Sequence, residues 1–433
     1  MKTVFVIANN LHENIMGAFR LRRLVRGLPA CGWHPVVFAH DKGDRNLPGL
    51  GPGVELVNVA APDLPALYAR LTGRSAAAPR PAAPSGGPVT VRDIGVTSFL
   101  NRWCMIPDKQ MLWRGPARRA VLARAAAQPP QLIFASLEPR TNLLVGADAA
   151  RALNVPYIAE YRDLWTDSPY FHNEQPTTLH AALHRRLQRQ VLRQATQVTC
   201  VARALGACLT RSFPAALRKP IEIHHNFFDP SEFDAVRTAR PADARPFTLA
   251  YVGAMYMTRS PEAFLRGLGL FLQRRQLAPS QFRFRWIGSV TGVAGLPEVL
   301  RASGTEPYID FVGMVPHAQA LAELLACDAT LILQATNDTI HIPGKLFEAM
   351  GARVPVLSVS PPCEHTELVE RTGCGLHAPH DPSLIADALD QLWNWRNAGT
   401  PWPFREEDIN YFRADHAIAR LAGLFDRVSG AAP

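Results

Sequence analysis

A lysine and a glutamate stand three positions apart in the stretch IHIPGKLFEAMGARVPVLSVS, residues 340–360. The pattern predicts that Lys345 and Glu348 lie on a short helix that precedes the strand VPVLSVS. A carboxylate can accept hydrogen bonds from both hydroxyls of a vicinal diol such as a ribose, and the ammonium group one turn earlier can pair with it or reach a phosphate. The spacing therefore allows either a nucleotide site or an i,i+3 surface pair.

A second candidate site follows the strand of FTLAYVGAMYMTRSPEAF. The strand ends at Gly253, and Arg259 precedes a Ser-Pro pair that is typical of a helix start, where proline costs no hydrogen bond. Free N–H groups at a helix start, together with a guanidinium, suit a diphosphate. Arg259 alone could simply lie on a solvated loop. Together with Lys345 and Glu348, however, it favours a nucleotide site.

Two further groups of residues follow predicted strands of the first half. Gly17, in NNLHENIMGAFR, could let backbone N–H groups approach an anion, or it could be an ordinary loop glycine. No GxGxxG motif surrounds it, so a dinucleotide site is poorly supported. In EYRDLWTD, Arg162 and Asp163 stand where the chain leaves a strand, and Trp165 offers a flat apolar surface of the kind that stacks on sugars.

Several other chemistries are not supported by the sequence. It contains no GxSxG, HExxH or P-loop motif, and the pair His224-His225 lacks further ligands at metal spacing. No nucleic-acid-binding motif occurs. The seven cysteines form no CxxC pair, which predicts neither a disulfide framework nor a zinc site and favours a reducing cytoplasm.

The elements that must position these residues alternate between short apolar runs and longer helical patterns. This alternation predicts βαβ units in an α/β fold with two facing Rossmann-like, doubly wound domains and a cleft between them. We expect an N-terminal domain over residues 1–236 with a mobile loop at 72–92, a linker at 237–246 and a C-terminal domain at 247–405. The last segment, 406–433, is expected to hold a helix that could pack back on the N-terminal domain.

The net charge of +9 comes mainly from arginine, which binds phosphates and carboxylates but is also frequent in GC-rich genomes. Two predicted helices, FRLRRLVRG and HRRLQRQVLRQ, are basic and amphipathic. They could lie on an anionic bilayer, or they could pack their leucines on a sheet and expose their arginines. No apolar run reaches the ~18 residues of a membrane-spanning helix. We therefore expect a cytoplasmic protein that could also dock on the inner face of the membrane.

The sequence resembles the family-4-like, retaining GT-B glycosyltransferases of bacteria over nearly its whole length. The stretches that carry the resemblance are ENIMGAFRLRRLVRGLPACGW, QLIFASLEPRTNLL, VPYIAEYRDLW, IEIHHNFFDPSEF, LAYVGAMYMTRSPEAF, FVGMVPHAQALAELLACDATLIL and PGKLFEAMGARVPVL. The resemblance implies transfer of a sugar from a nucleoside-diphosphate sugar to a glycan, a lipid-linked or a small-molecule acceptor. It also implies retention of configuration, and neither a metal nor a cofactor besides the donor.

The resemblance also assigns roles to residues. Glu348 would bind the ribose, and the Gly17 backbone would meet the diphosphate. Arg259 and Lys345 would hold this leaving group and, with Asp163, are the catalytic candidates. Further donor-site candidates are Gly253, His341 and Leu346, and the acceptor-side candidates are Arg162, Trp165, Glu138 and Asn226.

Three positions depart from the family pattern. Ala254 stands in place of a frequent arginine after the strand glycine, and Asn226-Phe227 stands in place of a usual Asn-Gly pair. His341 stands where relatives usually place a carboxylate that faces the donor sugar. Two alternatives to a glycosyltransferase therefore stay open. One is a nucleotide-sugar epimerase on the same fold, and the other is a non-catalytic protein that binds a nucleotide sugar or a glycan.

Overall fold

The computed structural model describes most of the chain. The described residues are 1–13, 15–41, 50–62, 103, 105–168, 177–236, 245–253, 255, 259–290, 293 and 295–430. The expected mobile loop at 72–92 lies outside the described residues, as do residues 237–244 of the expected linker.

The described chain forms two compact units. The first contains the described residues up to Asn226 together with the C-terminal helix from Ala414, and the second contains the described residues of Phe227–Arg413. The division thus falls at Asn226–Phe227 rather than in the expected linker. The reason is long-range packing, because the rings of Phe228 and Phe233 lie against Gly351 of the second unit.

The first unit is built on a seven-stranded parallel sheet with the strand order β3-β2-β1-β4-β5-β6-β7. Its strands are β1 (Lys2–Ile7), β2 (Trp33–His40), β3 (Glu55–Val59), β4 (Leu132–Ser136), β5 (Tyr157–Tyr161), β6 (Gln197–Cys200) and β7 (Glu222–Ile223). Its helices are α1 (Met16–Gly27), η1 (Leu28–Cys31), η2 (Met111–Trp113), α4 (Arg114–Ala127), α5 (Arg140–Leu153), α7 (Thr178–Gln194), α8 (Arg203–Ser212), η3 (Pro214–Ala216) and α17 (Ala414–Gly430).

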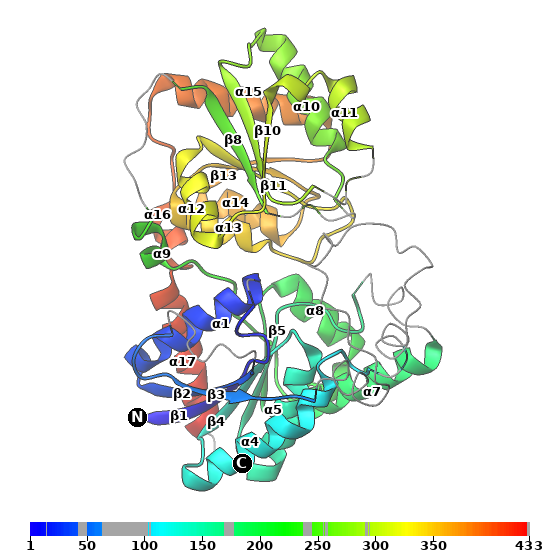
Figure 1. The fold of residues 1–433 in the computed structure, drawn as a ribbon, viewed down its shortest axis with the longest axis vertical. Helices are drawn as coiled ribbons and strands as arrows, with labels where there is room; N and C mark the ends of the chain where they lie inside the picture. The colour runs from blue at the N-terminus through cyan, green and yellow to red at the C-terminus, as the bar shows by residue number, and fades with distance from the viewer. Residues whose placement is uncertain are drawn as a thin grey trace, which may run out of the picture. The chain divides into compact units, whose positions relative to one another are not determined.

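Helices cover both faces of this sheet, which explains why the central strands β1 and β4 carry continuous apolar runs rather than an alternating pattern. Helix α17 packs beside α1, while α4 and α5 pack against each other on the opposite face (Figure 1). The Phe425 ring of α17 lies 5.6 Å from the Trp33 ring and 5.4 Å from the Phe134 ring. Helix α17 is therefore part of the core of the first unit.

The second unit has a six-stranded parallel sheet with the strand order β10-β9-β8-β11-β12-β13. Its strands are β8 (Phe247–Val252), β9 (Phe282–Ile287), β10 (Ile309–Gly313), β11 (Ala329–Leu333), β12 (Val356–Val359) and β13 (Gly375–Ala378). Its helices are α9 (Pro230–Asp234), α10 (Glu262–Arg275), α11 (Leu296–Ser303), η4 (Glu306–Tyr308), α12 (His317–Ala326), α13 (Gly344–Ala352), α14 (Glu364–Thr372), α15 (Pro382–Ala398) and α16 (Glu406–Asn410).

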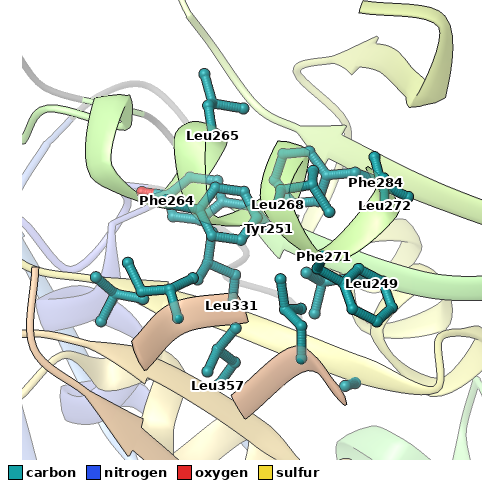
Figure 2. Packing of buried hydrophobic residues seen from close by; sticks show 14 of the residues in the cluster. Leu249, Tyr251, Phe264, Leu265, Leu268, Phe271, Leu272, Phe284, Leu331 and Leu357 are labelled. Atoms are coloured by element: carbon teal, nitrogen blue, oxygen red, sulfur yellow. The ribbon is translucent and has the colours of Figure 1, made fainter. Parts of the chain in front are cut away.

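The core of the second unit lies between its sheet and helices α10 and α15. Figure 2 shows Phe264, Leu268 and Phe271 of α10 packed among side chains of the strands, including Leu249 and Leu331. All five side chains are fully or almost fully buried. Cores of this density hold their side chains in fixed rotamers, so the ends of β8 and β11 are rigid supports for the residues that follow them.

Both sheets change direction of strand order once, between β1 and β4 in the first unit and between β8 and β11 in the second. In doubly wound sheets, ligands bind beyond the carboxyl ends of the strands at such a switch point. The expectation of two Rossmann-like domains is confirmed. Among the described residues, none of the helices has the length and apolar character needed to cross a bilayer.

Candidate functional site

Lys345 of the second unit lies beyond the carboxyl end of β8. The helix that carries it, α13, begins directly after Pro343, and the Lys345 Nζ atom lies 4.0 Å from the centre of the Tyr251 ring. Gly253 makes this placement possible. A Cβ atom on Gly253 would lie 2.5 Å from both Cε and Nζ of Lys345. The Gly253 backbone also has a φ of +128°, which disfavours any residue other than glycine. The structure thus brings together two residues that lie 92 positions apart in the sequence.

The electrostatics of this cluster favour an anionic ligand. Burial lowers the pKa of Lys345 below its ordinary value, with Tyr251 and Glu348 opposing this shift and Arg259 adding to it. Burial alone would raise the pKa of Tyr251, but the Lys345 and Arg259 cations outweigh it and hold this pKa below its ordinary value. Two cations therefore share one phenol, and an added anion would relieve their repulsion.

Tyr251 was not among the residues singled out from the sequence. It reads there as an ordinary strand residue of FTLAYVG, and its side chain is fully buried in the core. Its position two residues before Gly253 is the only available signal, since it fixes the ring on the sheet beside the glycine.

Glu348 lies one helical turn after Lys345 and is 7% exposed. Because it is buried, a solvent-exposed ion pair does not describe it. Its Oε1 atom lies 3.9 Å from His317 Nε2 at the start of α12, and the same imidazole nitrogen lies 3.4 Å from Glu232 Oε2. His317 is a second residue that sequence reasoning missed.

The loop before α13 is held by hydrogen bonds to Gln334, which directly follows β11. Gln334 Nε2 donates to the His341 carbonyl oxygen at 2.7 Å, and Gln334 Oε1 accepts from His365 Nδ1 at 2.6 Å. The His341 imidazole itself is tied to Asp338 Oδ1 at 2.8 Å. Leu346, a predicted donor-site residue, places its side chain fully in the core.

The first unit gathers several predicted residues around the guanidinium of Arg162, just after β5. Arg162 Nε donates to Ser136 Oγ at 2.7 Å, and Nη2 donates to the Glu138 carbonyl oxygen at 3.1 Å. Its Nη1 atom occupies the space beside Gly17, where an added Cβ would lie only 1.6 Å away. Gly17, Glu138 and Arg162 thus form one cluster at the carboxyl edge of the first sheet.

A buried ion pair supports this cluster. Arg20 of α1 donates to Glu160 Oε1 at 2.6 Å, and their side chains are 5% and 0% exposed. Ser136 Oγ donates to the other carboxylate oxygen at 2.6 Å. Burial alone would raise the pKa of Glu160, but the arginine cations outweigh it and hold this pKa below its ordinary value. Arg20 also reaches the predicted residue Asn226, with Nη1 3.4 Å from Oδ1.

Two expectations for the first unit are corrected by burial. Trp165 is fully buried, and its Nε1 atom donates to His184 Nδ1 at 2.9 Å, so its ring has no face for a sugar. In α1, Arg20 and Arg23 are 4% and 5% exposed and point into the protein rather than toward a membrane. Asp163 is exposed, with Oδ1 accepting a hydrogen bond from the Leu164 backbone N–H at 2.8 Å.

Acid should weaken the loop support in a predictable way. Burial lowers the pKa of His365 to about 4 from its ordinary 6.5, with His377 adding to the shift and Asp338 opposing it. Between these pH values the unfolded chain takes up a proton that the folded protein does not, so the stability from the neutral imidazole is full above pH 6.5 and declines as the pH falls toward 4.

We therefore expect the loss of unfolding free energy in His365→Asn to be roughly 2 kcal/mol smaller at pH 5 than at pH 7.5, measured by urea denaturation. The exposed His416 supplies the control, because His416→Asn should have the same small effect at both pH values. An equal loss in His365→Asn at both pH values would contradict a neutral, buried His365.

Models of two glycosyltransferase domains match this chain. A family model described as "Glycosyl transferase 4-like domain" matches residues 17–222, and one described as "Glycosyl transferases group 1" matches residues 246–394. A search of curated protein sequences found no match.

Solved structures share the fold at low sequence identity. Sucrose-phosphate synthase from Thermosynechococcus elongatus has a TM-score of 0.67 at 14% identity, with 100% of each chain covered. HepE from Anabaena, in complex with UDP and glucose, has a TM-score of 0.65 at 14% sequence identity. The match covers 99% of this chain and 100% of the HepE chain. UDP-GlcNAc 2-epimerase from Methanocaldococcus jannaschii has a TM-score of 0.53 at 12% sequence identity, and the match covers 99% of this chain and 100% of the epimerase chain. The chain therefore belongs to the family-4-like glycosyltransferases and has their GT-B fold, as the resemblance of its sequence predicted.

Proposed function

We propose that this glycosyltransferase takes its sugar from a nucleoside-diphosphate sugar, with UDP-glucose as the first donor to test, and transfers it to an acceptor hydroxyl. The observation that carries the proposal is Lys345 lying over Tyr251 in the space left by Gly253, with Glu348 on the next turn of α13. The solved complex of HepE with UDP and glucose, on the same fold, supports this class of donor.

In this proposal the two cations act on the leaving group. As the glycosidic bond breaks, negative charge develops on the diphosphate, and Lys345 and Arg259 stabilise it without reorganising. Glu348 accepts hydrogen bonds from the ribose hydroxyls and fixes the position of the nucleotide. The family resemblance further supports retention of configuration, metal independence, and a role in making glycans, polysaccharides, glycolipids or glycosylated metabolites.

The acceptor side is proposed to lie on the first unit. Arg162 and Asp163 follow β5 there, near Glu138, and Asn226 is linked to the same edge through Arg20. The Gly17 backbone stays a predicted contact of the diphosphate.

One assay separates this function from its two alternatives. Conversion of UDP-glucose to another UDP-sugar without any acceptor would indicate an epimerase, and binding without consumption under every acceptor would indicate a non-catalytic binding protein.

Turnover in the presence of a chelator is expected to equal turnover without it. A loss that Mg²⁺ restores would contradict metal independence.

The role of Glu348 gives a direct test. Glu348→Ala should weaken UDP binding by about 100-fold, because a carboxylate that accepts two hydrogen bonds is lost. Isothermal titration calorimetry measures this affinity. The exposed Glu370 on α14 is a matched control, and Glu370→Ala should bind UDP like the wild type. Unchanged affinity in Glu348→Ala would contradict the assignment.

We also propose that α7, rather than α1, is the face that meets an anionic membrane. Four arginines of α7 are exposed, namely Arg185, Arg186, Arg189 and Arg193. Two leucines of the same helix, Leu179 and Leu183, are 65% and 39% exposed, and Trp103 beside His180 is 41% exposed. A basic helix with exposed apolar side chains suits the boundary between headgroups and acyl chains.

Liposome co-sedimentation tests this face. The double variant Arg186→Glu and Arg189→Glu should bind vesicles of phosphatidylserine and phosphatidylcholine at least about 30-fold more weakly than the wild type. The same charge change at the exposed Arg118 and Arg119 of α4 is the control and should leave most of the binding intact. A wild-type protein that does not sediment with these vesicles at low salt would remove the proposal.

A further inference from the structure

We propose that Ser136 and Glu160 are positioning residues that hold Arg162 against Gly17, where its guanidinium binds an oxyanion of the substrate. The inference rests on the proposed function and deepens it. It also gives Gly17 a different reason to be glycine, which is to admit the Arg162 side chain.

The hydrogen bonds define a chain of three side chains. Glu160 is fully buried at the end of β5, and its two carboxylate oxygens accept from Arg20 and from Ser136, both at 2.6 Å. Ser136, also fully buried, accepts in turn from Arg162 Nε at 2.7 Å. Because the serine hydroxyl donates to the carboxylate, its lone pairs face the arginine. The Glu160 charge thus orients Arg162 without touching it.

The backbone at Gly17 explains why space, rather than conformation, requires glycine. Ten other described glycines have a positive φ, but Gly17 does not, since it is the second residue of the regular helix α1. Any residue could adopt its backbone conformation. An added Cβ would lie 1.6 Å from Arg162 Nη1, 2.5 Å from Cζ and 2.8 Å from Nη2. A side chain at this position is incompatible with the observed place of Arg162.

The charges around Arg162 determine what it would bind. Arg20 and Arg162 share the one fully buried carboxylate of this network, that of Glu160. The other two carboxylates near Arg162, those of Glu138 and Asp163, are exposed. The first turn of α1 carries no acidic residue, and Arg162 lies beside it, where the helix macrodipole is positive. An oxyanion is the complementary ligand, and a phosphate fits the fork geometry of arginine. It could belong to the donor diphosphate or to an anionic acceptor.

A double-mutant cycle tests the coupling. We expect Gly17→Ala and Arg162→Ala each to slow UDP release from UDP-glucose by about 100-fold, because a misplaced and a missing cation are equally unproductive. The double variant should be no slower than Arg162→Ala alone. Ser136→Ala should cost about 10-fold, and this loss should vanish in the Arg162→Lys background, where no Nε atom is left to orient.

Calorimetric titration of UDP on the same proteins identifies the source of the oxyanion. A lower UDP affinity in Arg162→Ala assigns the oxyanion to the donor diphosphate. Unchanged affinity with slower release assigns it to the acceptor. The stoichiometry of the titration gives the folded fraction of each variant, and the rate of UDP release is divided by this fraction. If Ser136 had only a structural role, the corrected rate of Ser136→Ala would equal the wild-type rate. That result would overturn the inference.

Gly146→Ala is the matched control for packing. Its added Cβ would lie 2.7 Å from the Tyr157 ring and 2.8 Å from the Ala135 side chain, within the same unit but without Arg162. Its effect should be independent of Arg162→Ala. If the loss in Gly17→Ala persists in the Arg162→Ala background, it does not come from displacement of Arg162 and the inference is wrong. A wild-type protein that neither binds UDP nor turns over UDP-glucose contradicts the proposed function instead, and the inference falls with it.

Discussion

The contact of the half-buried Lys345 ammonium with the Tyr251 ring is the interaction on which the proposed donor site depends. Moving an ammonium group out of water is costly, and a single cation–π contact returns only about 0.5–2 kcal/mol. The rest must come from neighbouring anions or from a ligand, which is why the cluster favours a phosphate. The geometry requires a ring fixed in the core of the second unit, a glycine after β8 and a helix that begins at Gly344.

The two units share one arrangement, in which a cationic side chain packs against a glycine. In each, a glycine lies between the unit's first strand and the helix that follows it or at the start of that helix, and a cationic side chain from later in the same unit occupies the space that a Cβ atom would fill. In the first unit the cation is Arg162 beside Gly17, and in the second it is Lys345 beside Gly253. The absence of a Cβ atom thus serves to bring a charge to the switch point, where doubly wound sheets bind ligands. In both units the cation is positioned by residues that lie fully inside the protein, namely Glu160 with Ser136 and Tyr251.

Much of this arrangement follows from sequence patterns, and the part that does not has a physical reason. The alternation of apolar runs and helical patterns predicts both sheets, and strand-end positions predict that Gly253, Arg259, Lys345 and Glu348 share one edge. The direction of a side chain is harder to predict. Trp165 follows a strand end, as a ligand-binding residue would, yet it is buried, because the segment after β5 turns back onto α7 and pairs Trp165 with His184.

The arginines of α1 and the boundary between the two units are also hard to predict, because both depend on contacts between residues far apart in the sequence. The periodicity of FRLRRLVRG indicates an amphipathic helix, but it cannot reveal that Arg20 meets a glutamate 140 positions later in the chain. Glu160 itself gives a signal, since a charged residue inside the apolar run VPYIAEY must find a partner. The boundary at Asn226–Phe227 escapes prediction because it is decided by long-range packing of Phe228 and Phe233.

The most direct test of the donor-site account is the affinity of Lys345→Met for UDP compared with its affinity for uridine, both measured by calorimetry. Methionine keeps the apolar length of the side chain beside Tyr251 and removes only the charge. The account predicts that UDP binds about 30-fold or more weakly than to the wild type while uridine affinity stays the same, because only the diphosphate contacts the ammonium group. Equal affinities of the wild type and Lys345→Met for UDP would contradict it.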